Sequence, residues 1–417
     1  MRDDHVPADR VAVVGAGMIG LATAWFLQER GVGVDVFERV HVGAGSSWGN
    51  AGWLTPALVA PLAEPAVLRY GVRAVLDPAS PVYVPFGVQP RLWRFLGSFA
   101  RHCTARRWRR GVHAYRDVNR QALDAFDRLA AGGVDAPTRA ADPFLACFAT
   151  AAARDGLLEE LAALEELGQK VGYDVVPPAR ARELAPILTD HVVAAVQLHD
   201  QRFIDPPRYL AALADAVRAR GARVAEHTPV LDVRDDGRHV ALSTRDDVHR
   251  YDAVVLATGA WLPELASRVG VRVPVQAGRG YSFTVPAEQL PAAPIYLPAQ
   301  RVACTPLRER LRIAGMMEFR GPDEPLDPRR IRAIVEAVRP FLRGVDLADR
   351  RDEWVGSRPC TPDGLPLIGP TSSPRIHVAG GHGMWGIVLG PLTGRLLAEA
   401  IVSGHPPHEL RPFRPDR

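Results

Sequence analysis

The sequence of 417 residues contains few cysteines, and those it has are widely spaced. Cys103, Cys147, Cys304 and Cys360 form no CxxC pair. This argues against both a disulfide framework and a zinc site, and it is typical of proteins in a reducing cytoplasm. We therefore expect a cytoplasmic protein without a metal centre.

Lysine is almost absent, since Lys170 is the only one and arginine supplies nearly all of the positive charge. The net charge is only +4, and no basic stripe with interleaved aromatic residues appears, which argues against nucleic-acid binding. No run approaches the roughly 18 continuous apolar residues that span a bilayer. The polar start MRDDHVPADR is unlike a signal peptide.

What is present, with 47% hydrophobic residues, is the composition of a globular α/β protein long enough for two or more domains. Apolar patterning predicts strands at 11–14 and 34–37, a β-meander from 221 to 259, and more strands between 271 and 319. Helices are predicted at 18–30, 90–103, 115–131, 155–171, 327–342 and 387–402. Glycine-rich strand-to-helix turns at both ends of the chain predict one nucleotide-binding domain assembled from separated segments.

The first of these turns, GAGMIG at 15–20, fits the GxGxxG pattern between a strand and a helix. Gly15 permits the tight turn, Gly17 lets a pyrophosphate approach the backbone, and Gly20 lets helix and strand pack closely. Glu38 ends the next strand, close to the expected ~20 residues downstream, where a carboxylate can accept hydrogen bonds from an adenosine ribose. The motif therefore predicts dinucleotide binding, with NADP disfavoured.

Three later features favour FAD over NAD. A β-meander rather than a helical crossover precedes the buried strand that ends at Thr258 and Gly259. No second GxGxxG marks a separate nicotinamide domain. The glycine turn at 380–386 begins another helix, whose N-terminus could stabilise the negative charge of a reduced flavin; the alternative is a glycine-rich connector.

Several stretches, taken together and in order, resemble the D-amino-acid oxidase-like (DAO) family of FAD-dependent oxidoreductases, and within it the bacterial D-amino-acid dehydrogenases. They are the opening turn, SSWGNAGWLTP at 46–56, GRGYSFTV at 278–285, GSRPCTPDGLPLIG at 356–369 and GHGMWG at 381–386, with a weaker match at 80–103. The resemblance implies a Rossmann-like FAD-binding domain beside a substrate domain built on a large antiparallel sheet. The expected boundaries are 1–60, 195–270 and 354–417 for the first domain, and 61–194 and 271–353 for the second.

The resemblance also implies a set of cofactor-binding residues. This set comprises Gly15, Ala16, Gly17, Met18, Ile19, Gly20, Glu38, Arg39, Ser46, Ser47, Asn50, Ala51, Gly52, Val230, Thr258, Gly259, His382, Gly383, Met384, Trp385, Gly386 and Ile387.

Two residues are predicted to act in catalysis. Arg358 matches the arginine that grips the amino-acid carboxylate in relatives, and its guanidinium could fix the substrate α-carbon over the flavin. The alternative for Arg358 is one more surface arginine. Tyr281 could present its hydroxyl to the substrate or simply pack in a sheet.

Two positions depart from relatives. Sarcosine-oxidase relatives attach flavin through a cysteine ahead of the TPD element, where this chain has Gly356, so we expect non-covalent FAD. Glycine-oxidase relatives carry an arginine in the last glycine loop, where this chain has Met384, which argues against a glycine-like substrate.

The expected activity is oxidation of an amino-acid C–N bond, a D-amino acid favoured, by hydride transfer to flavin N5, followed by hydrolysis to a 2-oxo acid and ammonia. The alternatives are a secondary-amine oxidase for sarcosine, proline, hydroxyproline or a biosynthetic intermediate, and a non-catalytic flavoprotein subunit. The electron acceptor is expected to be a quinone or oxygen. The basic, aromatic helix at 90–103 could touch the inner face of a membrane, or it could pack its apolar face on the protein.

Overall fold

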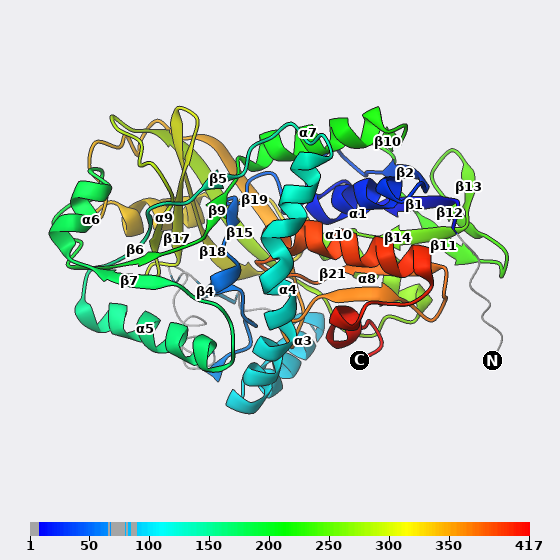
Figure 1. The fold of residues 1–417 in the computed structure, drawn as a ribbon, viewed down its shortest axis with the longest axis horizontal. Coiled ribbons are helices and arrows are strands. Elements are labelled where there is room, and N and C mark those ends of the chain that lie inside the picture. Colours follow the sequence, from blue (N-terminus) through cyan, green and yellow to red (C-terminus); the bar gives the residue numbers. More distant parts are fainter. Residues whose placement is uncertain (1–7, 66, 68–79, 81, 85–89) are drawn as a thin grey trace.

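The computed structural model describes residues 8–65, 67, 80, 82–84 and 90–417, so part of the stretch 80–103 lies outside the described residues. Two sheets lie side by side, one in each half of the molecule (Figure 1). The chain passes between the halves several times, since strands from its beginning, middle and end belong to the same sheet.

One sheet has six strands in the order β10-β2-β1-β14-β21-β20, and all neighbours are parallel except β20 and β21. Its strands are β1 (Arg10–Val14), β2 (Gly33–Phe37), β10 (Arg223–Ala225), β14 (Ala253–Leu256), β20 (Leu367–Pro370) and β21 (Ile376–Gly380). Their apolar residues are buried on both faces, as a parallel sheet requires. This is the Rossmann-like arrangement that the opening turn predicts.

Helices cover one face of this sheet and a small meander covers the other. The helices are α1 (Met18–Glu29), α7 (Pro206–Ala219) and α10 (Gly386–Ser403). The meander consists of β11 (Asp232–Asp235), β12 (Val240–Ser243) and β13 (Val248–Tyr251), with η2 (Gly259–Trp261), α8 (Leu262–Ala266) and η3 (Ser267–Val269) beside it. The turn before α10 thus meets the turn before α1 on one side of the sheet.

The predicted meander is wrong at both ends. Its last strand, β14, lies in the six-stranded sheet between β1 and β21, and its first strand is misplaced as well. The run at 221–227 forms β10, which pairs in parallel with β2 through Val224 and Val36 and does not join the meander. The reason is α7, a helix the sequence analysis did not predict, which supplies a crossover that places β10 at the sheet edge.

The other sheet is larger and mostly antiparallel, in the order β19-β15-β18-β17-β16-β6-β8-β7, with β4 beside β18. Its strands are β4 (Val82–Tyr83), β6 (Phe144–Phe148), β7 (Tyr173–Val176), β8 (Ala194–Leu198), β15 (Gln276–Pro286), β16 (Ile295–Leu297), β17 (Val302–Leu307), β18 (Arg310–Phe319) and β19 (Arg351–Cys360). The helices α5 (Ala151–Glu166), α6 (Pro178–Leu184) and α9 (Pro328–Val338) accompany it (Figure 1).

Short elements complete the chain. They are β3 (Trp53–Leu54), β5 (Arg139–Ala140) and β9 (Arg202–Phe203), which form a three-stranded sheet, with η1 (Pro56–Leu58) and η4 (His408–Phe413). The strands of the six-stranded sheet all fall within the segments expected for the cofactor domain. By contrast, β8 and β19 of the large sheet cross the expected boundaries at 195 and 354.

Two helices, α3 (Pro90–His102) and α4 (Ala105–Ala131), lie between the halves (Figure 1). The helix α4 begins ten residues before the predicted 115, because the Thr104 side chain caps it by accepting the Arg107 N–H. On α3, Leu92, Phe95 and Phe99 are buried in the protein, whereas Trp93 is 48% exposed. The apolar face of α3 therefore packs as an ordinary core-facing helix.

One helix in the described part of the chain, α10, is long and apolar enough to cross a membrane by length and composition. Because 72% of that span is buried within the protein, against α1 and α4, its apolar surface is satisfied as part of the core.

Candidate active site

The first glycine turn has a backbone that only glycine fits. Gly15 has φ +108°, and a Cβ there would lie 2.5 Å from the Ala257 carbonyl oxygen. At Gly20, a Cβ would lie 1.9 Å from the Gly15 carbonyl oxygen, so glycine at this position allows α1 to pack closely against the turn. The Ser47 hydroxyl accepts the Met18 N–H at 3.3 Å and so lies at the start of α1.

The Glu38 carboxylate lies at the end of β2, next to this turn. Its Oε2 accepts the Ala16 N–H at 2.8 Å, and its Oε1 accepts the Val40 N–H at 2.9 Å. Each carboxylate oxygen can accept a further hydrogen bond, so the group is held in place and still able to bind a ligand hydroxyl. The guanidinium of Arg39 stacks on the Trp261 ring, 4.2 Å from its centroid.

Around this turn lies a cavity of about 170 Å³, which we call the cofactor cavity. Most of the predicted cofactor-binding residues line it, although they come from five separate parts of the chain. They are Gly15, Gly17, Met18, Ile19, Glu38, Arg39, Ser46, Ser47, Asn50, Val230, Thr258, Gly259, His382, Gly383, Met384, Gly386 and Ile387.

Five predicted residues do not line this cavity. Ala16 lies behind it and donates to Glu38, and Gly20 packs inside the turn. Ala51 and Trp385 line a second cavity instead. Gly52 lines neither cavity. Its φ is +79°, and a Cβ there would lie 2.3 Å from the Ile204 carbonyl oxygen, so glycine is needed for the backbone conformation and for this close approach.

The cofactor cavity fits a dinucleotide that carries polar groups. A buried polar atom has no protein partner at one of its lining residues, Thr258 Oγ1. Burial lowers the pKa of His382 to about 3, so the imidazole is neutral, with Nε2 2.9 Å from Thr393 Oγ1. Because buried polar groups are normally hydrogen-bonded, the Thr258 hydroxyl marks a position for a ligand contact.

The second cavity, of about 450 Å³, opens against the large sheet and is called the substrate cavity. It shares four lining residues with the cofactor cavity, namely Ser46, Asn50, Arg358 and Met384. The two cavities therefore adjoin at these residues.

At this junction Arg358 extends from β19 over the neighbouring strand β15. Its Nη1 donates to the Met316 carbonyl oxygen at 2.8 Å and contacts the Met317 sulfur at 3.9 Å. No carboxylate of the described residues pairs with it. Desolvation lowers the pKa of the guanidinium from its usual value, yet an arginine keeps its charge, so the site holds a partly buried cation that can bind an anion.

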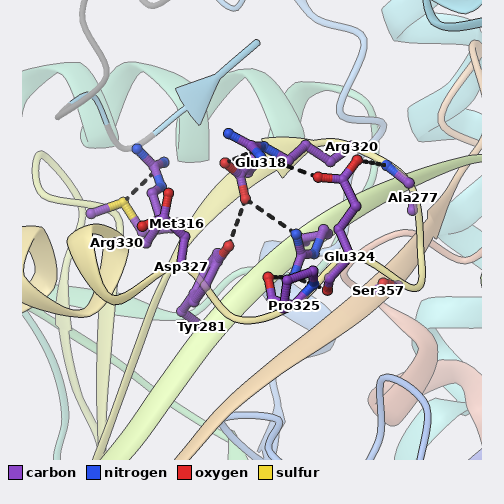
Figure 2. Close-up of polar contacts among 12 residues, drawn as sticks. Ala277, Tyr281, Met316, Glu318, Arg320, Glu324, Pro325, Asp327, Arg330 and Ser357 are labelled. Atoms are coloured by element: carbon purple, nitrogen blue, oxygen red, sulfur yellow. Dashed lines mark hydrogen bonds and ion pairs between the residues drawn. The ribbon is translucent and has the colours of Figure 1, made fainter. Parts of the chain in front are cut away.

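Tyr281 lines the substrate cavity with its ring, but its hydroxyl is turned away. Figure 2 shows this hydroxyl donating to Glu318 Oε2, at 2.6 Å. Glu318 is fully buried and also pairs with Arg320 at 2.9 Å and Arg279 at 3.7 Å. Burial, and the bond to Glu318, raise the Tyr281 pKa. Of the two roles considered for Tyr281, the structure favours packing within the sheet.

Sequence analysis missed several residues that line the cavities. Trp261 and Ser357 line the cofactor cavity. Trp354, Tyr296 and the charged residues Glu64, Glu160 and Arg301 line the substrate cavity. Ser357 lies within the recognised motif at 356–369, and Trp354 and Trp261 each lie two residues from a recognised position; the other residues come from segments without a motif, so no local signal could have found them.

A cavity built around a dinucleotide-binding turn, beside a second cavity that Arg358 also lines, is the arrangement expected of a dinucleotide-dependent oxidoreductase. Comparison with known proteins agrees: the family model "FAD dependent oxidoreductase" (DAO) matches residues 10–400. The chain belongs to this family, and it is therefore an FAD-dependent oxidoreductase.

Individual relatives cover nearly the whole chain. It is 30% identical over 406 residues to a D-amino acid dehydrogenase of Xylella fastidiosa, covering 94% of this chain and 92% of that protein. It is also 30% identical to a D-amino acid dehydrogenase of Bradyrhizobium diazoefficiens, covering 98% of both. Among solved structures, glycine oxidase from Geobacillus kaustophilus has a TM-score of 0.73 at 25% identity, covering 98% of this chain and 99% of that one.

Proposed function

We propose that this enzyme oxidises the C–N bond of a free amino acid, with D-amino acids preferred, to an imino acid that water hydrolyses to a 2-oxo acid and ammonia. The observation that carries the proposal is Arg358, a partly buried guanidinium without a carboxylate partner among the described residues, where the two cavities adjoin. The name shared by the relatives at 30% identity supports the D-series.

Arg358 would bind the substrate carboxylate through two parallel hydrogen bonds, which fix the orientation of the α-carbon as well as its position. The amine binds in its neutral form, and its lone pair drives C=N formation as the α-hydrogen departs. FAD, when bound, supplies the acceptor for this hydride at N5. Of the four residues shared by the cavities, only Arg358 carries a charge, and its guanidinium stays protonated, which suits a reaction that needs no protein base.

We propose that the FAD is held without a covalent bond. Gly356 occupies the position of the flavin-linking cysteine of relatives, and a Cβ there would lie 1.9 Å from the Trp354 indole. A side chain at this position would have to displace the tryptophan. Flavin recovered in the supernatant after acid precipitation would support this, and flavin retained on the polypeptide would contradict it.

We also propose that the six-stranded sheet and its covering layers form the FAD-binding domain, and that the large sheet forms the substrate domain. The position of the cofactor cavity around β1 and α1, and of the substrate cavity against β15 and β18, supports this division.

We propose that the electron acceptor is a quinone in preference to oxygen. The enzyme would reach the quinone through, at most, a peripheral contact with a membrane surface. Exposed Trp93 and Arg91 on α3, with Arg106 and Arg109 on α4, supply the aromatic and basic groups that such a contact needs. Turnover with a quinone dye should exceed turnover in air. Stoichiometric peroxide formation in air without dye would make the enzyme an oxidase.

Anaerobic reduction of the bound flavin tests the proposed function. The purified protein is mixed with D-, L- and N-methyl amino acids in turn, and loss of the flavin absorbance is recorded. We expect reduction by primary D-amino acids. Reduction by N-methyl or cyclic amines alone would make the enzyme a secondary-amine oxidase, and no reduction by any of them would favour a non-catalytic subunit.

A further inference from the structure

The substrate cavity has a second charged region, separate from Arg358. Glu64 comes from the segment after η1, Glu160 from α5, and Arg301 from the turn between β16 and β17. All three line the cavity although they are far apart in the sequence. We call them the distal charged cluster.

The members of the distal charged cluster interact electrostatically with one another and not with Arg358. The charges of Glu64 and Arg301 shift the pKa of Glu160, and the charge of Arg301 shifts the pKa of Glu64. The pKa of Arg358, by contrast, is shifted by burial and by Cys360. The cavity therefore has two charged ends. Burial is the main cause that raises the pKa of Glu64, and that of Glu160 to about 7, so these carboxyl groups lack sufficient compensating charge.

A third polar group faces the same end of the cavity without a partner. Tyr296 lines the cavity, enclosed by protein, with its ring packed against Trp53 at a centroid distance of 5.3 Å. Among the described residues, no hydrogen bond joins the Tyr296 hydroxyl or the carboxyl groups of Glu64 and Glu160 to another group. Within the described residues, three groups that line this cavity can therefore accept a hydrogen bond from a ligand.

The wall of the rest of the cavity is largely apolar. It includes Leu62, Leu157, Met316, Met317 and Phe319. A chain of methylene groups could lie along this wall, as the stems of lysine and arginine do on apolar surfaces.

From these observations we infer that the distal charged cluster is a subsite for the cationic side chain of the substrate, so that the preferred substrates are basic amino acids with an ammonium or guanidinium head. The inference rests on the proposed function, because it takes Arg358 as the carboxylate end. Among the described residues, Arg301 is the one guanidinium that acts on the two carboxyl groups. A substrate cation would neutralise a further carboxyl group and donate hydrogen bonds to it.

Matched substrates test the subsite. D-Arginine and D-citrulline have nearly the same shape and differ in charge, so kcat/KM for flavin reduction should be about tenfold or more higher for D-arginine. The same pair is used in the L-series if that series reduces the flavin. Glu160→Gln should lower kcat/KM for D-arginine by about tenfold and lower it less for D-citrulline, so that the preference between the two substrates shrinks. Glu159→Gln is the matched control, because Glu159 directly precedes Glu160 on α5 and does not line the cavity.

Binding gives a readout independent of turnover. 5-Guanidinopentanoate, which lacks the reacting amine, should raise the Tm of the holoenzyme more than hexanoate does, and Glu160→Gln should remove the difference. Equal kcat/KM for D-arginine and D-citrulline would overturn the subsite while the proposed function stands. Failure of every amino acid to reduce the flavin would instead overturn the proposed function.

Discussion

Gly280 leaves the space that the Arg358 guanidinium occupies. The two residues lie on neighbouring strands, β15 and β19, and a Cβ at Gly280 would lie 2.1 Å from Arg358 Nη2. The guanidinium can cross β15 and reach the cavity junction only because position 280 has no side chain.

Gly280→Ala should therefore displace the guanidinium without removing its charge. A misplacement of about 1 Å can cost about 100-fold in catalysis, so kcat/KM should fall by that order while FAD content stays the same. Steady-state kinetics and the flavin-to-protein absorbance ratio check this. Gly97→Ala, where a Cβ meets nothing within 4 Å, is the control and should leave kinetics unchanged.

The contact between Tyr281 and Glu318 predicts a loss of stability rather than of chemistry. Tyr281→Phe removes a donor from a fully buried carboxylate, so unfolding free energy should fall by about 1–3 kcal/mol with KM within about twofold of wild type. Urea unfolding and substrate titration measure the two quantities. Lost turnover at unchanged stability would show that the hydroxyl acts on the substrate.

Two buried histidines predict a stability that falls in mild acid. Burial lowers the pKa of His377 to about 4 and that of His382 to about 3, from 6.5. The unfolded chain therefore binds more protons as pH drops below 6.5, and stability is lost until the folded pKa is reached.

Each of these histidines should cost about 2 kcal/mol of unfolding free energy between pH 6.5 and pH 5. Denaturant unfolding at the two pH values measures this. His377→Gln, a position outside the cofactor cavity, should reduce the pH dependence by about half of the histidine contribution. An unchanged pH dependence in this variant would contradict the assignment.

Much of the fold could be predicted because local signals agreed with the tertiary structure. Two segments illustrate this, the glycine turn at 15–20 and the helix at 386–403. Each needs a particular backbone conformation, and that conformation restricts which residue types can occupy the segment. The strand at 221–227 was misplaced because its pattern is the same in a meander and in a parallel edge, and only α7 decides between them.

Some residues of the candidate site could likewise be predicted from the sequence, and others could not. Residues in glycine-rich or Arg-Pro motifs, such as Gly15 and Arg358, could be found in the sequence. Glu64, Glu160 and Arg301 could not, because a charged residue between apolar neighbours looks the same on a surface as on a cavity wall. The direction of the Tyr281 hydroxyl depends on Glu318 from another strand, a contact across 37 residues.

The central claim, that Arg358 binds the carboxylate of an amino-acid substrate, is tested most directly by anaerobic flavin reduction in Arg358→Leu and Arg358→Lys. Loss of the partner of a desolvated carboxylate costs about 3–5 kcal/mol, so the apparent substrate constant of the leucine variant should rise at least about 100-fold with FAD retained. Lysine should restore only part of this, because it lacks the planar fork. Flavin reduction by Arg358→Leu at the wild-type substrate constant would contradict the account.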